Sequence, residues 1–98
     1  MIKVSVLYPN GAGATFDMDY YCQSHMPMVQ RTLGAALKAL SADHGIANQG
    51  PYLAMGHLMF DSVEEFQAAL ATHGATFLAD VPNYTNTQPV FQVSEVRL

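Results

Sequence analysis

The spacing of apolar residues along the chain predicts four β-strands. Residues 2–8 alternate, so that four apolar side chains share one face: Ile2, Val4, Val6 and Tyr8. Residues 52–60 (YLAMGHLMF) are apolar on both faces, a pattern typical of a strand that is covered on both sides. Residues 37–46 and 89–98 are weaker matches to the same pattern and complete the set.

Residues 15–34 instead carry apolar side chains at helical spacing: Met18, Tyr21, Cys22, His25, Val29 and Leu33. Asp17 is placed to cap the start of this helix, and Gly34 is a natural end for it. Pro27 lacks a backbone donor, and its ring crowds the carbonyl group of Gln23. We therefore expect the helix to kink or break near His25.

A second helix is predicted from a capping box at residues 62–65 (SVEE) to Asp80. Its apolar stripe consists of Val63, Phe66, Ala69, Leu70, His73 and Phe77. The element order is then βαββαβ within one domain, residues 1–98. This order predicts a ferredoxin-like α+β fold, a four-stranded antiparallel sheet with both helices on one face. Because the strands also carry apolar groups on the other face, that face is either a ligand cleft or a contact with a second subunit.

Composition favours the second subunit. Half of the 98 residues are hydrophobic and only 12% are charged, which is apolar for so small a domain. We expect a homodimer in which two sheets enclose an α+β barrel. The formal charge of −4 argues against nucleic acid or a membrane surface as a partner. A lone cysteine, together with the lack of a signal peptide, is typical of a cytoplasmic protein.

His25 is the first candidate for a chemical role, because it is a titratable ring on the apolar stripe of a helix. It is either a core histidine that bonds a carbonyl group freed by Pro27, or a general acid or base that burial keeps neutral. His57 and Tyr8 are the other catalytic candidates. His57 lies in the doubly apolar strand, facing either the helices or the open side of the sheet, and Tyr8 ends the first strand.

Three further side chains are candidates for binding a substrate: Asn83, Tyr84 and Gln92. Asn83 and Tyr84 lie in the loop before the last strand, and Gln92 is polar within that strand. We interpret His44 and His73 as structural or surface groups, and Cys22 as inert packing on the apolar stripe. No metal-binding, phosphate-binding or dinucleotide-binding motif is present, so we expect no metal ion and no cofactor.

Several segments together resemble the EthD family. They are MIKVSVLYPNG, FDMDYYCQSHMPMV, MGHLMFDSVEEFQAAL and DVPNYTNTQPVFQVSEV, and they span nearly the whole chain. The most specific feature is the spacing Y-x-x-x-H-x-P, formed by Tyr21, His25 and Pro27. The resemblance implies a dimeric α+β barrel, adds Tyr21 to the site, and brings with it the family label of a reductase. No nicotinamide or flavin motif in the chain supports that label.

Three hypotheses follow for function. The first is an enzyme acting on a small hydrophobic or aromatic molecule, in which His25 moves a proton and Tyr8 and His57 orient the substrate. The second is a binding or accessory protein that holds such a molecule without chemistry. The third is haem handling through two histidines.

Overall fold

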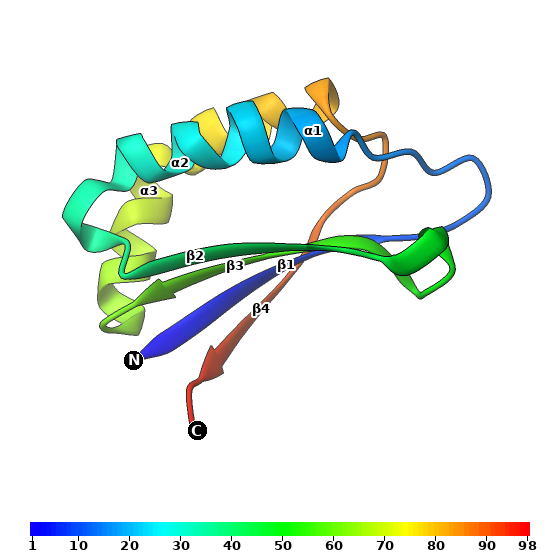
Figure 1. Ribbon diagram of the computed structural model, residues 1–98. Coiled ribbons are helices and arrows are strands. Elements are labelled where there is room, and N and C mark those ends of the chain that lie inside the picture. The colour runs from blue at the N-terminus through cyan, green and yellow to red at the C-terminus, as the bar shows by residue number, and fades with distance from the viewer.

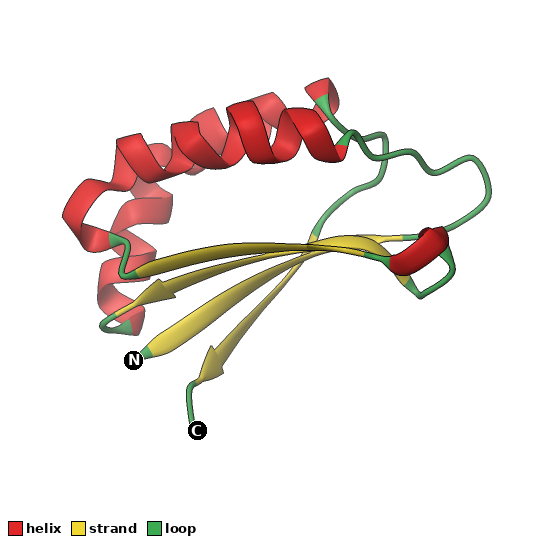
Figure 2. Ribbon diagram, in the orientation of Figure 1, coloured by secondary structure: helices red, strands yellow, loops and turns green.

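The computed structural model describes residues 1–98 and has a single four-stranded antiparallel sheet. The strands are β1 (Ile2–Pro9), β2 (Ala39–His44), β3 (Tyr52–Phe60) and β4 (Val90–Glu95), in the order β2-β3-β1-β4. The two long helical regions, residues 18–33 and 63–80, pack on one face of this sheet, and the opposite face carries no helix (Figures 1 and 2). The predicted ferredoxin-like fold is confirmed.

The strand boundaries agree best where the sequence pattern is strongest. β3 begins and ends at the predicted residues. β2 is shorter than the predicted segment 37–46, because a short 3-10 turn precedes Leu37 and another begins at Ile46. β4 is shorter than 89–98, because Pro89 lies outside the ladder and the last three residues leave it.

The first helical region runs without a break from Met18 to Leu33 (Figure 1). It consists of α1 (Met18–Tyr20), a π-helical turn (Tyr21–His25) and α2 (Met26–Leu33). The side chain of Asp17 caps it by accepting from the backbone of Tyr20 at 3.0 Å, as predicted. The expected irregularity near His25 is present, but it widens the helix by one residue per turn instead of breaking it.

The wider turn changes which side chains face the sheet. Tyr21, His25 and Met26 are all buried, whereas Cys22 is exposed. The prediction that Cys22 packs on the apolar stripe is therefore wrong, because α-helical spacing does not hold across a π turn.

The second long helix, α3 (Val63–Asp80), begins at a Ser62 cap whose hydroxyl accepts from the backbone of Glu65 at 3.2 Å. It packs on the sheet less completely than its predicted stripe implies. Val63 and Leu70 are 40% and 45% exposed, and Gly74 is the only buried residue of the helix.

The core divides into two buried groups between helices and sheet. One contains Ile2, Val4, Val29, Leu33 and Phe60. The other is richer in polar atoms and contains Tyr8, Tyr21, Met26, Ala54 and Tyr84. The second group lies where the π-helical turn meets the end of α3, and the candidate site lies among these residues.

The pairing of residues between neighbouring strands shows which side chains share the open face, the face of the sheet that no helix covers. Ser5 is paired with His57 on one side and Gln92 on the other, and His57 is paired with Ser41. Apolar side chains flank this polar row: Leu7, Met55, Met59 and Val90. No helix of the structure combines the length and the apolar character needed to cross a membrane.

Candidate functional site

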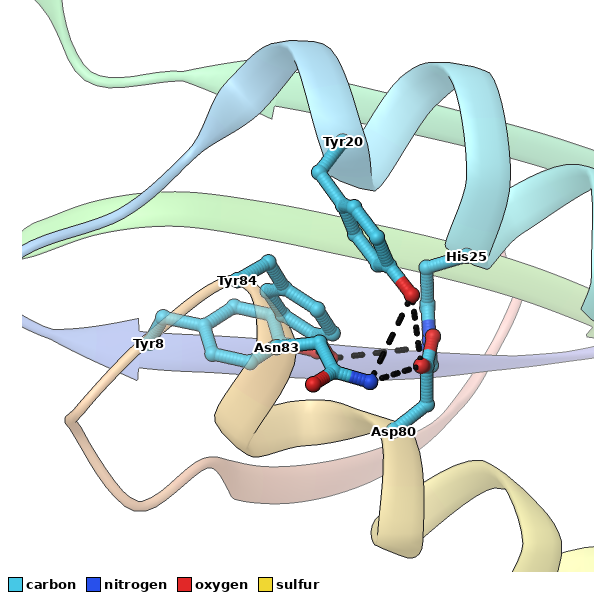
Figure 3. Close-up of polar contacts among 6 residues, drawn as sticks. All are labelled: Tyr8, Tyr20, His25, Asp80, Asn83 and Tyr84. Atoms are coloured by element: carbon cyan, nitrogen blue, oxygen red, sulfur yellow. Dashed lines mark hydrogen bonds and ion pairs between the residues drawn. The ribbon is translucent and has the colours of Figure 1, made fainter.

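The buried His25 and the partly buried Asp80 form a pair that joins the first helical region to the end of α3. The Nδ1 atom of His25 lies 2.9 Å from Oδ2 of Asp80 (Figure 3). Because an ionised carboxylate only accepts, Nδ1 carries the proton and donates it to Asp80. The second ring nitrogen, Nε2, is then an acceptor that is free to receive a proton.

Two more donors converge on the other oxygen of the Asp80 carboxylate. The hydroxyl of Tyr20 and the amide of Asn83 each donate to Oδ1 at 2.8 Å (Figure 3). An acidic residue in the last turn of a helix faces the negative end of the helix dipole, which is unfavourable. The three donors compensate for this position and hold the carboxylate in one orientation.

Three tyrosine hydroxyl groups gather on the inner side of His25. The hydroxyl of Tyr84 lies 3.5 Å from Nε2 of His25 and 2.7 Å from the hydroxyl of Tyr8. The ring of Tyr21 stacks on the imidazole, with centroids 5.4 Å apart and planes 13° apart. Tyr21 reaches the sheet over Gly56, where a Cβ atom would lie only 2.1 Å from its hydroxyl oxygen.

The burial of this cluster sets its protonation. Burial lowers the pKa of His25, although the hydrogen bond and the charge of Asp80 oppose this effect. Burial raises the pKa of Asp80, but the hydrogen bonds from Asn83, His25 and Tyr20 outweigh it and bring the pKa below its ordinary value. Burial also raises the pKa of Tyr8, Tyr21 and Tyr84. At neutral pH the site therefore holds a neutral imidazole, a carboxylate and three protonated phenols.

A narrow cavity of about 70 Å³ extends from this cluster between α3 and the sheet. His25, Tyr8, Tyr21 and Tyr84 line one part of it, and nearly all other lining side chains are apolar. Asn83 lies on the outside, in a shallow polar groove that also borders Tyr84. Tyr84 is thus the residue that separates the outer groove from the inner cavity.

The structure brings together His25, Tyr8, Tyr21 and Tyr84, with Asn83 one contact away through Asp80. It does not bring His57 or Gln92 to this cluster. His57 lies on the open face of the sheet, where Nδ1 is 2.9 Å from the hydroxyl of Ser5 and Nε2 is 3.1 Å from Asp43. Within one chain the sheet lies between His57 and His25, so the two histidines do not face the same cavity, and a role for His57 on the substrate of His25 stays a prediction.

Sequence reasoning missed Asp80 and Tyr20. Asp80 was placed only as the end of a helix, and its pairing with His25 spans 55 residues of sequence. A signal was nevertheless present, because a carboxylate in the last turn of a helix without a basic neighbour is electrostatically unfavourable. Such a residue is expected to have donors from elsewhere in the fold.

The chain contains no group of three or more His, Cys, Asp or Glu side chains arranged to hold a metal ion. The chemistry that the site can perform with its own residues is proton transfer. Its base would be Nε2 of His25, and its hydrogen-bond donors would be the phenols of Tyr8 and Tyr84.

The lowered pKa of His25 predicts how stability depends on pH. Below the ordinary value of 6.5, the unfolded chain takes up a proton at His25 that the folded chain does not. The free energy of unfolding should therefore fall as the pH drops from about 7.5 to about 5.5. Urea unfolding measures this, and His25→Asn should show a smaller fall. An equal fall in both proteins would contradict the pKa shift.

A ferredoxin-like sheet, one helix layer and a His–Asp–Tyr cluster beside a narrow cavity define the class: a small ferredoxin-like α+β protein. The sequence profile of the EthD domain matches residues 11–88. The chain belongs to the EthD domain family, as the spacing of Tyr21, His25 and Pro27 indicated.

Solved structures agree with this assignment. An EthD-like protein from Ralstonia eutropha is 44% identical, with a TM-score of 0.90 over 99% of this chain and 92% of that one. An EthD-family protein from Bacillus halodurans is 17% identical, with a TM-score of 0.74 over 99% of both chains. A protein from Bacteroides fragilis, described as dimeric, of unknown function and ferredoxin-like, is 10% identical, with a TM-score of 0.55 over 97% and 95%. No curated protein matches the chain.

Proposed function

We propose that the protein is an enzyme that moves a proton on a small hydrophobic molecule, with His25 as the base. The observation that carries this proposal is the orientation of the imidazole. Asp80 accepts from Nδ1 at 2.9 Å, so the unprotonated Nε2 faces the tyrosine cluster and the cavity. A buried neutral imidazole that a carboxylate orients in this way is the arrangement of a general base.

The reaction most compatible with these groups is removal of a proton from a carbon next to a carbonyl group. Nε2 of His25 takes the proton, and Asp80 stabilises the imidazolium that forms. The electron pair of the broken C–H bond moves onto the carbonyl oxygen, to which Tyr84 or Tyr8 can donate a hydrogen bond. If the proton on Nε2 is first replaced from solvent, its return to the same carbon gives exchange. Return to another carbon gives isomerisation, so neither outcome requires a redox step.

The raised pKa of both phenols supports their part in this scheme. A phenol that burial keeps protonated remains a hydrogen-bond donor at neutral pH and does not compete with His25 as a base. The 2.7 Å contact between the two hydroxyl groups lets one support the other while it donates to a substrate oxygen. Tyr21 packs against the imidazole and limits its movement.

Deuterium exchange tests the proposal with a simple diketone in place of the natural substrate. Acetylacetone has acidic hydrogens between two carbonyl groups, and NMR in D₂O follows their loss. We expect the protein to accelerate this exchange above the buffer rate, and His25→Gln to reduce the acceleration by at least about 100-fold. Gln67→Glu, on the exposed side of α3, is the control.

Binding of acetylacetone with no acceleration of exchange would contradict the enzyme proposal. It would favour the alternative, a binding or accessory protein that holds a hydrophobic metabolite without chemistry. Acceleration that survives His25→Gln would show that another group is the base.

We also propose that two copies of the chain pair through the open face of the sheet. That face has no helix, and Leu7, Met55, Met59 and Val90 surround its central polar row. A relative with the same fold is described as dimeric. Pairing of the two sheets would remove these apolar side chains from water, which is the main contribution expected at such an interface.

Light scattering tests the pairing. The chain has a mass of 10.7 kDa, so a homodimer should scatter with about twice that mass. Met55→Glu places a charge on the open face and should shift the population toward the monomer, whereas Gln67→Glu should not. A stable monomer of the unmodified protein at micromolar concentration would contradict the proposal.

A further inference from the structure

We propose that the open face of the sheet carries a second reactive site, in which Ser5 is the nucleophile that accepts the acyl group of a carboxylic ester. His57 is its general base, and Asp43 positions the imidazole. All three residues belong to one chain and lie across the sheet from His25. The site is therefore independent of the proton transfer proposed for His25, and it gives a role to two residues outside that cluster, His57 and Gln92.

The imidazole of His57 is hydrogen-bonded through both of its nitrogen atoms. Its Nδ1 atom lies 2.9 Å from the hydroxyl oxygen of Ser5, and its Nε2 atom lies 3.1 Å from Oδ2 of Asp43. Because an ionised carboxylate only accepts, the ring proton is on Nε2 and points to Asp43. The Nδ1 atom is then the acceptor, and the hydroxyl of Ser5 donates to it. A hydroxyl that donates to an imidazole which a carboxylate orients is the arrangement of an activated nucleophile.

Three neighbouring strands fix this geometry. Ser5 is on β1, His57 on β3 and Asp43 on β2, and antiparallel pairing places Ser5 directly opposite His57. Asp43 lies two residues beyond Ser41, the partner of His57 on β2, so its carboxylate reaches the ring diagonally. The side chain of His57 is only 19% exposed, whereas that of Asp43 is 68% exposed. The sheet therefore holds nucleophile and base in contact while most of the ring is screened from water.

A donor for the oxygen that becomes negative lies on the other side of Ser5. Gln92 of β4 is the cross-strand partner of Ser5, so the two side chains point to the same face. One N–H of the Gln92 amide donates to the hydroxyl of Ser94 at 3.2 Å, and the second is free to donate to a substrate oxygen. Amide donors of this kind stabilise the oxyanion of a tetrahedral intermediate.

The reaction that these groups support is acyl transfer to water. The oxygen of Ser5 bonds to the carbonyl carbon of the ester while its proton passes to Nδ1 of His57. Collapse of the tetrahedral intermediate breaks the bond to the alcohol oxygen, which takes that proton and leaves. Water then attacks the acylated Ser5 with the same help from His57 and releases the carboxylic acid. The net reaction is ester hydrolysis, which needs no oxidant or reductant.

Apolar side chains beside the polar row determine the kind of ester. They are Leu7, Met55, Met59 and Val90. An apolar acyl group buries its surface against them and gains the free energy of leaving water. Pairing of two copies through this face would place the acyl group between two sheets and increase that gain. The expected substrate is therefore an ester of a short apolar acid.

An organophosphate tests the inference, because it phosphorylates an activated serine and leaves it labelled. Diethyl p-nitrophenyl phosphate should transfer one diethylphosphoryl group to the oxygen of Ser5 and release p-nitrophenolate, and tandem mass spectrometry identifies the labelled residue. The rate of labelling should fall by at least about 100-fold in His57→Gln. Ser5→Ala should remove the label at this position. Hydrolysis of p-nitrophenyl butyrate should fall in parallel in both variants.

Ser41→Ala is the matched control. Ser41 also lies beside His57 on the open face, but of the two serines only Ser5 is hydrogen-bonded to the imidazole. Its replacement should change both rates by less than about twofold. Circular dichroism verifies that each variant folds. Absence of label on Ser5, equal labelling of Ser41, or an unchanged rate in His57→Gln would overturn the inference.

Asp43 is a positioning residue, and the tautomer of His57 tests its role. NMR of the ring nitrogens should show the proton on Nε2 in the unmodified protein and a mixture of both tautomers in Asp43→Asn. The rate of labelling should fall at least about tenfold in that variant. A ring proton on Nδ1 in the unmodified protein would mean that Ser5 accepts instead of donating, which would contradict the inference. Exchange of acetylacetone is measured with a different compound, so either proposal can fail without the other.

Discussion

Replacing Asp80 by asparagine should reduce the His25-dependent exchange of acetylacetone by about 100- to 1,000-fold, nearly as much as removing the imidazole. The reason is the tautomer of His25. Tyr20 and Asn83 both donate to Oδ1 of Asp80, so the amide oxygen of the new asparagine is favoured at that position. The NH₂ group then faces Nδ1 of His25 and donates to it, which moves the ring proton to Nε2 and leaves no base toward the cavity.

Asn83→Ala is the control for this prediction. It removes one donor from Oδ1 but leaves the carboxylate in contact with His25. The exchange rate should stay within about threefold, since the tautomer is unchanged. NMR of the imidazole nitrogens reports the tautomer directly in both variants. If Asp80→Asn kept most of the exchange rate, Asp80 would have only a structural role.

Gly56→Ala should cause the largest loss of stability of any single methyl addition considered for this chain. The new Cβ atom would lie 2.1 Å from the hydroxyl oxygen of Tyr21 and 3.2 Å from Cε of Met26. Both neighbours are buried, so neither can move away freely. We expect destabilisation by about 3 kcal/mol, which for a domain of this size lowers the melting temperature by roughly 10–20 °C.

Two variants isolate the cause. Gly11→Ala adds a methyl group at a glycine with nothing within 4 Å, and it should change stability by less than about 0.5 kcal/mol. In the double variant Gly56→Ala/Tyr21→Phe the clashing hydroxyl is absent, so the combined loss should be smaller than the sum of the single losses. Thermal unfolding followed by circular dichroism measures the unmodified protein, Gly11→Ala, Gly56→Ala, Tyr21→Phe and the double variant. Strict additivity would show that the contact with Tyr21 is not the cause.

The sequence was sufficient for the fold where a segment had one strong pattern. The limits of β3 follow from a run that is apolar on both faces, and Asp17 and Gly34 fix the ends of the first helical region by local chemistry. The weaker segments around β2 and β4 were predicted too long, because alternation alone does not show where cross-strand pairing stops.

The candidate site was predictable only in part. His25 was recognisable as a polar residue on an apolar stripe beside Pro27. Its partner Asp80 was not, because the contact depends on how two helices pack on one sheet face. The separation of His57 from His25 was only half predictable: alternation along the strand places Gly56 and His57 on opposite faces, but the contact of Gly56 with Tyr21, which the fold creates, shows which face meets the helices.

The π-helical turn between Tyr21 and His25 also determines how this segment tolerates changes of length. A π turn contains one residue more than an α turn, so deleting one residue among Cys22, Gln23 and Ser24 would restore regular α-helical spacing. An α turn and a π turn each complete about one revolution, so the residues before the deletion would keep nearly the same direction relative to α2. Tyr21 would still face Gly56, and His25 would stay in place. Because Cys22, Gln23 and Ser24 are also exposed, the stretch should accept substitutions and should tolerate a one-residue deletion better than an insertion.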